Sequence, residues 1–288
     1  GVPLLGFYFW CTNQFMVQRM LSAKDLNHGR WGALFAGLLK LPVLFTMVLP
    51  GTAAILLYPN LERPDMVYPT LMFDLLPAGI LGLVVAGFMA ALLSQVTSTL
   101  NSASTLVTMD FVRRIKPDLT GQQLLVCGRV AAIIFMLVAM TWAPMIAQFD
   151  SLFKYLQAIL AYSVPPVVAM FLVGAFWSRA NAQGAFAALI CGLVAGVVLF
   201  YMNVIAKTIQ IHFLYVGPII LVISLVALVI GSLMTPAPDP EKTRPYLWTK
   251  EYFRQETVEL KAMPWYQNYR ILSALLLLAT AVIVIAFR

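Results

Sequence analysis

The chain alternates long runs of apolar residues with short polar connections. Runs long enough to cross about 30 Å of hydrocarbon lie near residues 3–20, 31–58, 77–112, 124–144, 152–177, 184–204, 212–234 and 270–287. We therefore predict an all-α polytopic membrane protein with about eight transmembrane helices.

Basic residues are divided unevenly between the two sets of alternating connections. Arg63, Lys154, Lys207 and Arg288 fall on one side, and only Lys40 lies inside a predicted span. By the positive-inside rule the richer side is cytoplasmic, and it holds Arg19, Lys24, Arg30, Arg113, Arg114, Lys116, Arg129, Arg179, Lys242, Arg244, Lys250, Arg254, Lys261 and Arg270. This distribution predicts that both chain ends lie outside and that the loop 236–270 is cytoplasmic.

The predicted cytoplasmic loop combines charges with seven aromatic residues, among them Trp248 and Trp265. Such a mixture is typical of a helix that lies along the inner membrane surface. A solvated linker that ends in an aromatic belt is the alternative, and the sequence leaves both open.

Composition agrees with a membrane protein and argues against several other classes. Hydrophobic residues make up 61% of the 288 and charged residues 11%, against about a quarter charged in soluble proteins. The net charge of +7 is dispersed among the connections, so nucleic acid is not an expected partner. Three cysteines in apolar surroundings indicate no disulfide framework. The opening GVPLLGFYFW has neither an initiator Met nor a signal peptide, and we expect it to lie in the middle of a longer protein.

A stripe of polar residues follows the apolar run 76–93. In ALLSQVTSTLNSASTLVTMD (91–110), six of them recur at steps of three or four, which is helical spacing: Ser94, Thr97, Ser98, Asn101, Ser102 and Thr105. One or two hydroxyls would serve helix packing or bond back to their own backbone. Six on one face favour a site for a hard cation, and the absence of a carboxylate indicates Na⁺ rather than a divalent ion.

Three further polar features lie within predicted spans, where such groups mark functional sites by default. WCTNQ (10–14) interrupts the first span, which is typical of transporter helices that expose backbone to a substrate but also of an interhelical hydrogen-bond network. If its helix starts near Trp31, Lys40 lies about 15 Å deep beside a kink at Pro42. It needs either a ligand hydroxyl or a carboxylate. The amide of Gln157 suits a polyhydroxylated solute or ordinary helix association, and Pro165 and Pro166 disrupt its span two turns deeper.

Motifs of enzymes are missing from the sequence. It contains no HExxH, GxSxG, Walker A or GxGxxG pattern, and its two histidines, His28 and His212, are isolated. We predict that the protein is not an enzyme.

Several strings together resemble the sodium/glucose cotransporter family of solute:sodium symporters. They are FWCTNQFMVQRMLSAKDL, LLKLPVLFTMVLPG, YPTLMFDLLPAGILGLVVAGFMAALLSQVTSTLNSASTLVTMDF and FKYLQAILAYSVPPVVAMFLVGAFWSRANAQGAF. The resemblance implies a LeuT-like fold of two inverted five-helix repeats, with this chain starting at the first helix of the second repeat. The missing N-terminal repeat would then be its structural partner. The expected parts are 1–178 as the second repeat, 179–235 as peripheral helices, 236–269 as the cytoplasmic loop and 270–288 as the last span.

The same resemblance implies a sodium site. The family's inner site takes a backbone carbonyl and two hydroxyls, and the matching positions are Ala91, Ser94 and Gln95. Gln95 departs from the family pattern, which has Ser or Thr there. Thr97 and Ser98 match hydroxyls that form a second sodium site in some members, so the sodium stoichiometry stays open.

Sugar contacts and a gate carry over in the same way. Lys40 and Gln157 match residues that hydrogen-bond sugar hydroxyls, and Trp10 matches a Trp beside the inner gate. The gate itself matches Phe9, where the family usually has Tyr, so the stacking face is kept and a hydroxyl is lost. Gly6 replaces a polar residue that contacts ligand in some members.

The resemblance implies a plasma-membrane symporter that uses Na⁺ as coupling ion to accumulate a sugar or related polyol. Two alternatives remain. One is a sodium symporter for an amino acid, carboxylate or vitamin, and the other is a sodium-responsive membrane sensor that moves no solute.

Overall fold

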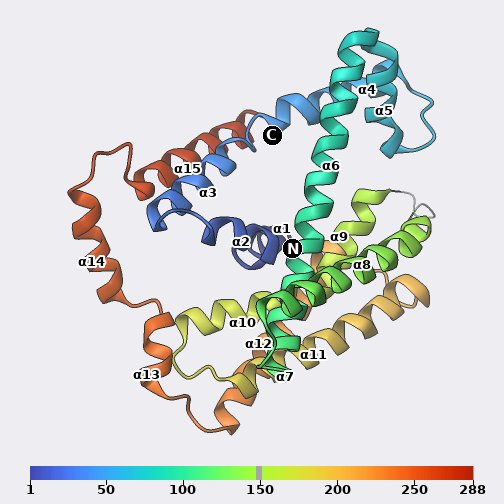
Figure 1. Ribbon diagram of the computed structural model, residues 1–288. Coiled ribbons are helices and arrows are strands. Elements are labelled where there is room, and N and C mark those ends of the chain that lie inside the picture. Colours follow the sequence, from blue (N-terminus) through green and yellow to red (C-terminus); the bar gives the residue numbers. More distant parts are fainter. Residues whose placement is uncertain (147–150, 288) are drawn as a thin grey trace. The chain divides into compact units, whose positions relative to one another are not determined.

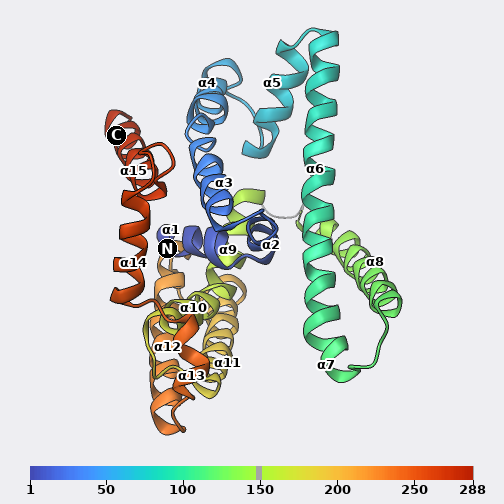
Figure 2. The same cartoon turned by 60° about the vertical axis from the view of Figure 1, so that its left-hand side comes forward.

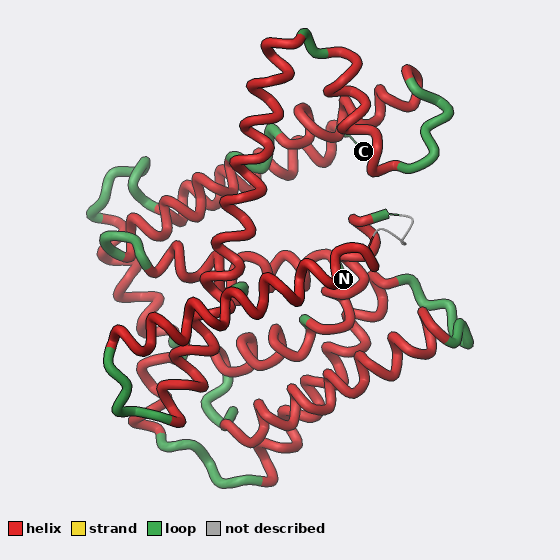
Figure 3. The backbone as a smooth tube through the Cα atoms, turned by 45° about the vertical axis from the view of Figure 1, so that its right-hand side comes forward, coloured by secondary structure: helices red, strands yellow, loops and turns green. Residues whose placement is uncertain are grey.

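The computed structural model describes residues 1–146 and 151–287, and in this part of the chain helices joined by turns and loops are present and strands are not (Figures 1 and 3). Five helices within it are long and apolar enough to cross a membrane, and a bent pair adds a sixth. The first of the five is Ala78–Ile115, which joins α6 (Ala78–Leu106), η4 (Val107–Val112) and α7 (Arg113–Ile115). The other four are α8 (Gly121–Ile146), α11 (Ala182–Phe200), α12 (Phe213–Met234) and α15 (Tyr269–Ala286). The bent pair is α9 (Leu152–Ser163) with α10 (Pro165–Phe176). The prediction of an all-α polytopic membrane protein is confirmed.

The first expected span, 3–20, is not one continuous helix. It divides into α1 (Val2–Phe7), a π-helical turn η1 (Tyr8–Thr12) and α2 (Gln14–Leu21). Asn13 separates them with extended backbone (φ −71°, ψ 117°), and its side-chain oxygen accepts from the amide of Phe15 at 3.4 Å. An Asn that caps a new helix ends the old one, so the polar interruption in the sequence corresponds to a real break.

The second expected span, 31–58, is also divided. Its parts are α3 (Leu26–Leu38), η2 (Leu44–Val48) and α4 (Leu49–Leu57), with turns between α3 and η2. Pro42 has no N–H to donate and disfavours helix in the preceding residue, which accounts for the break. The described residues therefore hold five or six helices of spanning length, fewer than the eight expected.

Contacts divide the chain into two units. Unit 1 comprises Gly1–Leu38 and Leu156–Arg288, and unit 2 comprises Leu39–Tyr155. The division falls inside α9, whose first turn belongs to unit 2. Contacts between residues define the two units, and they do not test the repeat boundary expected near residue 178. That boundary stays a prediction.

The core of unit 1 is a tightly packed helix pair, α11 and α12, with α10 against it (Figure 2). Small residues recur every fourth position on the buried face of α11, namely Gly184, Ala188, Gly192 and Gly196. A Cβ on Gly184 would lie only 2.7 Å from the carbonyl oxygen of Leu228, and one on Gly192 would lie 2.9 Å from Cβ of Pro166. The missing side chains therefore permit the close approach that small residues give membrane helices.

The bend between α9 and α10 is 50°, as the Pro165–Pro166 pair predicts. Leu4 and Leu5 of α1 pack against Val164 and Val168 at this bend. The broken first helix is therefore fixed to the bent one by a small apolar cluster.

A second contact region of unit 1 joins α3, α14 (Lys250–Lys261) and α15. Glu256 is buried on α14 and forms ion pairs with Arg30 of α3 and Arg270 of α15. The hydroxyl of Tyr269 donates to the same carboxylate at 2.8 Å. The loop 236–270 thus contains a helix whose buried face lies against protein, and its place along the membrane surface stays a prediction.

Unit 2 contains α4, α5 (Val67–Leu75), α6 and α8. α6 and α8 pack along one another (Figure 2), and a Cβ on Gly128 would meet Oγ1 of Thr108 at 3.4 Å. A small residue on α8 thus faces a hydroxyl of η4, the π-helical segment that continues α6.

Candidate functional site

The predicted gate residues lie beside the break at Asn13. Phe9 and Trp10 belong to η1, and their rings meet edge to face with centroids 5.6 Å apart. The ring of Phe9 also contacts Phe15 beyond the break, with centroids 5.9 Å apart. Three aromatic rings therefore bracket the point where the helix loses its regular backbone.

Gln157 lies on α9, six residues before its end, and is half-buried. The side-chain amide of Gln157 forms no hydrogen bond within the described ranges. Both donors and the acceptor of this group are therefore available to a solute.

Lys40 lies in the turn that follows α3, not within a continuous helix. Its carbonyl accepts from the amide of Val43 at 3.3 Å. The expectation that its helix starts near Trp31 is wrong, since α3 begins at Leu26 and ends at Leu38. Lys40 therefore lies in the second helix break of this chain, where hydrogen bonds of the turn pair the carbonyls of Lys40, Leu41 and Pro42.

The three residues expected at the inner sodium site lie near the middle of α6. Ala91, Ser94 and Gln95 are all exposed. Helical spacing places the carbonyl of Ala91 close to the side chains at 94 and 95. Together they form an open face of α6 with three oxygen atoms and no formal charge, and their role as sodium ligands stays a prediction.

Further along α6, two stripe hydroxyls and that of Thr108 in η4 bond back to the helix backbone. Ser98 donates to the Ser94 carbonyl at 2.8 Å, Thr105 to the Asn101 carbonyl at 2.7 Å, and Thr108 to the Ser104 carbonyl at 2.7 Å. Bonding to the helix's own backbone is the alternative to a cation site that the sequence offers for the stripe. It satisfies the hydroxyl protons, and a hydroxyl oxygen that donates in this way can also accept a hydrogen bond or coordinate a cation.

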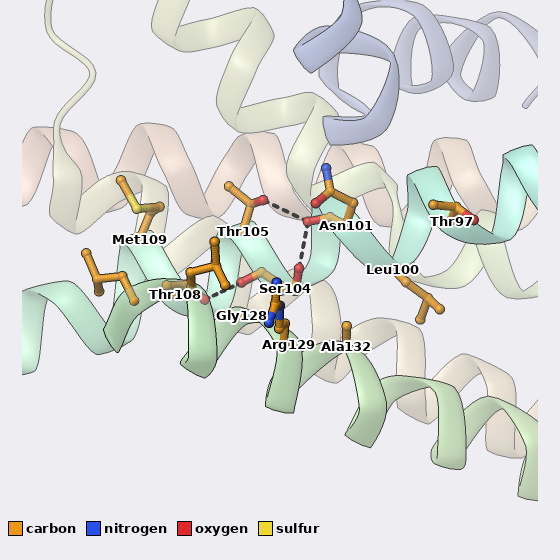
Figure 4. A pocket seen from close by; sticks show the side chains of 12 residues that line it. Thr97, Leu100, Asn101, Ser104, Thr105, Thr108, Met109, Gly128, Arg129 and Ala132 are labelled. Atoms are coloured by element: carbon orange, nitrogen blue, oxygen red, sulfur yellow. Dashed lines mark hydrogen bonds between the residues drawn. The ribbon is translucent and has the colours of Figure 1, made fainter. Parts of the chain in front are cut away.

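A pocket of about 610 Å³ lies between α6 and α8 (Figure 4). Thr97 and Asn101 line it from α6, Thr108 lines it from η4, and Arg129 lines it from α8. Ser94 is not among its lining residues, so the stripe divides into an open face around Ser94 and a pocket further on, which Leu100 and Leu124 also line.

The predicted site residues fall into two groups. Phe9, Trp10 and Gln157 belong to unit 1, whereas Lys40 and the residues of the sodium stripe belong to unit 2. Among the described residues no cluster of three or more His, Cys, Asp or Glu side chains could hold a metal ion. The side chains present suit a monovalent cation held by neutral oxygens.

A model of the sodium:solute symporter family matches residues 2–192. The chain belongs to the sodium:solute symporter family. This membership agrees with the resemblance found in the sequence.

Several curated relatives of this sodium:solute symporter chain carry informative names. It is 37% identical over 298 residues to sodium/glucose cotransporter 4 of Danio rerio, covering 92% of this chain and 45% of the relative. It is 34% identical to sodium/myo-inositol cotransporter 2 of Oryctolagus cuniculus, covering 91% and 43%, and 34% identical to a sodium/mannose cotransporter of Bos taurus, covering 86% and 47%. The chain thus spans less than half the length of these relatives.

Sequence reasoning missed two polar contacts near the predicted site of this symporter chain. The carboxylate of Asp65, in the short helix η3 (Pro64–Met66), accepts from the amide of Leu152 at the start of α9 at 2.9 Å. The indole N–H of Trp142 donates to the hydroxyl of Tyr155 at 2.8 Å. No local pattern signals either contact, because each depends on how separate helices pack.

Proposed function

We propose that this chain belongs to a secondary active symporter that couples the inward movement of Na⁺ to the uptake of a sugar or related polyol. The observation that carries the proposal is membership of the sodium:solute symporter family together with relatives named as sodium/glucose, sodium/myo-inositol and sodium/mannose cotransporters. Transport rather than enzymatic catalysis is the activity that these names support.

Two helix breaks support a site for a small polar solute. Transporters of this kind bind substrate where helices are interrupted, because the interrupted backbone offers unpaired groups. The first break carries Phe9 and Trp10, and the second carries Lys40. In the proposed site Lys40 and Gln157 orient the solute by hydrogen bonds, and Phe9 and Trp10 cover it from the cytoplasm.

The open face of α6 is the proposed sodium site. The carbonyl of Ala91, the hydroxyl of Ser94 and the amide oxygen of Gln95 would coordinate the ion. Thr97 and Ser98 would contribute to a second ion. Each ligand then binds more tightly to a state that the other also favours, which is the thermodynamic meaning of coupling.

We further propose a plasma-membrane protein with the LeuT-like inverted-repeat architecture. The loop 236–270 would be cytoplasmic and the α4–α5 connection external. Contacts support this topology, because residues predicted on one side meet one another. Arg30 pairs with Glu256, and Asp65 meets the start of α9.

The test is uptake of labelled glucose, galactose, inositol and a monocarboxylate by vesicles that contain the full-length protein, with and without a sodium gradient. Sodium-stimulated uptake of a sugar or inositol is expected. Uptake of the monocarboxylate alone would indicate a symporter for another solute. No sodium-stimulated uptake of any of them would refute the symporter and favour a sensor.

Two variants test the proposed residues. Ser94→Ala removes one sodium ligand and is expected to raise the half-saturating sodium concentration about tenfold, the equivalent of about 1.4 kcal/mol. Ser104→Ala is the matched control, because Ser104 lies about 15 Å further along α6 and bonds to its own backbone. Gln157→Ala is expected to raise the half-saturating sugar concentration by a similar factor at unchanged sodium dependence. An unaltered value for either variant removes that residue from the site.

A further inference from the structure

The first turn of α9 is held at two points by residues far away in the sequence. The amide of Leu152 donates to the Asp65 carboxylate at 2.9 Å, across 87 residues. Three residues later, the hydroxyl of Tyr155 accepts from the indole of Trp142 at 2.8 Å. All four residues belong to unit 2.

Each contact has a clear physical basis. The first amides of a helix have no partner within the helix, and a carboxylate satisfies one of them while favouring the positive end of the helix dipole. An indole N–H can only donate and needs an acceptor, which the Tyr155 hydroxyl provides. Positions three apart lie on the same face of a helix. The two bonds together therefore fix both the start of α9 and its rotation about its own axis.

Gln157 follows this turn directly. It lies two residues after Tyr155, a rise of about 3 Å along the helix axis. The direction of its side chain follows from the rotation of the first turn, because no break separates them within α9. A change in the cap would therefore be felt at the amide of Gln157.

We propose that Asp65 is a positioning residue for sugar binding, which acts by capping α9 and thereby orienting Gln157. Trp142 supports the same turn through Tyr155. This inference rests on the proposed function, since it takes Gln157 as a sugar contact. Asp65 itself does not touch the solute.

Capping makes a distinctive demand on the side chain. Asn caps a helix about as well as Asp, whereas Ala does not. A role in attracting Na⁺ or a cationic solute would instead need the negative charge. The neutral Asn variant therefore separates capping from electrostatic attraction.

The experiment measures sodium-driven sugar uptake by vesicles that contain the full-length protein with substitutions at Asp65. Asp65→Ala is expected to raise the half-saturating sugar concentration about fivefold, the effect of losing one cap, and to leave the sodium dependence unchanged. Asp65→Asn should stay within about twofold of the unaltered protein. Trp142→Phe should change sugar affinity in the same direction as Asp65→Ala. Glu62→Ala is the control, because Glu62 is an exposed carboxylate of the same loop.

A double variant tests whether the effect passes through Gln157. In the Gln157→Ala background, Asp65→Ala should add almost nothing to the loss of sugar affinity, since the side chain that it orients is gone. Full additivity would overturn the proposal. An Asp65→Asn variant as impaired as Asp65→Ala would also overturn it, in favour of a charge effect.

Hydrogen exchange at the first turn of α9 gives a readout that does not depend on transport. Asp65→Ala should speed exchange of the Leu152 amide, and Asp65→Asn should not. Unchanged exchange, or faster exchange without any loss of sugar affinity, would overturn the positioning role. If Gln157→Ala itself leaves sugar affinity unaltered, the proposed sugar site fails, while the exchange data still decide whether Asp65 caps α9.

Discussion

The ion-pair cluster around Glu256 makes a sharp prediction about stability. The cluster consists of Glu256 on α14, Arg30 on α3, and Tyr269 and Arg270 on α15. Glu256→Gln keeps the shape of the side chain and removes its charge. Two guanidinium groups then face a neutral amide, and part of that amide is itself a donor.

The magnitude follows from the burial of the partners. Removing one member of a buried ion pair costs about 3–5 kcal/mol, because the other charge is left uncompensated. Here the Glu256 side chain is 9% exposed, but those of Arg30 and Arg270 are 21% and 24% exposed, so water recovers part of that loss. Stacking of Arg270 on the ring of Phe253, at 3.9 Å, also survives the substitution. We expect a loss of about 2–3 kcal/mol.

The assay is thermal unfolding of the purified protein in detergent, followed by tryptophan fluorescence. The estimated loss corresponds to a fall in Tm of about 4–12 °C for a chain of this size. Glu259→Gln is the matched control, since Glu259 is an exposed carboxylate on the same helix, and its effect should stay within about 0.5 kcal/mol. Equal melting temperatures for the two variants would show that the cluster contributes no more than a surface ion pair and would refute the estimate.

The pH dependence gives an independent check on the same cluster. Burial alone would raise the pKa of Glu256, but the hydrogen bonds from Tyr269 and Arg270 and the charge of Arg30 outweigh it, so the pKa lies below its ordinary value. A carboxyl with a depressed pKa stabilises the fold above its unfolded pKa, about 4.3, and loses that contribution as the pH falls through the folded pKa. The difference in Tm between the unaltered protein and Glu256→Gln should therefore be constant near neutrality and shrink below about pH 4.

Two further substitutions test other parts of the chain. Gly192→Leu should prevent α11 from packing against Pro166 and Ser224, and we expect this overpacking to lower the free energy of unfolding by about 3 kcal/mol. Gly174→Leu, at a position with open space around it, should leave the melting temperature almost unchanged. Equal effects of the two substitutions would contradict the packing argument. Gln95→Ala should raise the half-saturating sodium concentration of uptake several-fold if the amide oxygen coordinates the ion, and an unaltered sodium dependence would show that Gln95 is not a ligand.

The sequence predicted those features of the fold that depend on local chemistry. Apolar length marked six of the helices, the Pro165–Pro166 pair marked the bend, and the polar residues around Asn13 marked the first break. It placed the start of α3 five residues too late. Hydropathy marks where the hydrocarbon begins, whereas the helix starts in the polar connection, where the Asp25 carboxylate accepts from the amide of His28 at 2.9 Å.

Contacts between distant segments lay beyond the sequence. Arg30 and Glu256 are 226 positions apart, and nothing in either local pattern selects the other as a partner. The same holds for Asp65 and Leu152. For the candidate site, the residue types suited to sodium and sugar were readable from spacing and resemblance, but the split of the hydroxyl stripe into an open face and a pocket depends on how α8 packs along α6.

The uninterrupted run from Ala78 to Ile115 has a mechanical consequence. Its 38 residues make a rod of about 57 Å, nearly twice the thickness of about 30 Å of hydrocarbon. Arg113 lies about 28 Å beyond Ser94 along this rod. A tilt of about 10° about Ser94 would displace Arg113 by about 5 Å, so the length of the helix amplifies any tilt at its far end. A fluorescent label at the neighbouring Arg114 position would therefore test whether sodium tilts this helix.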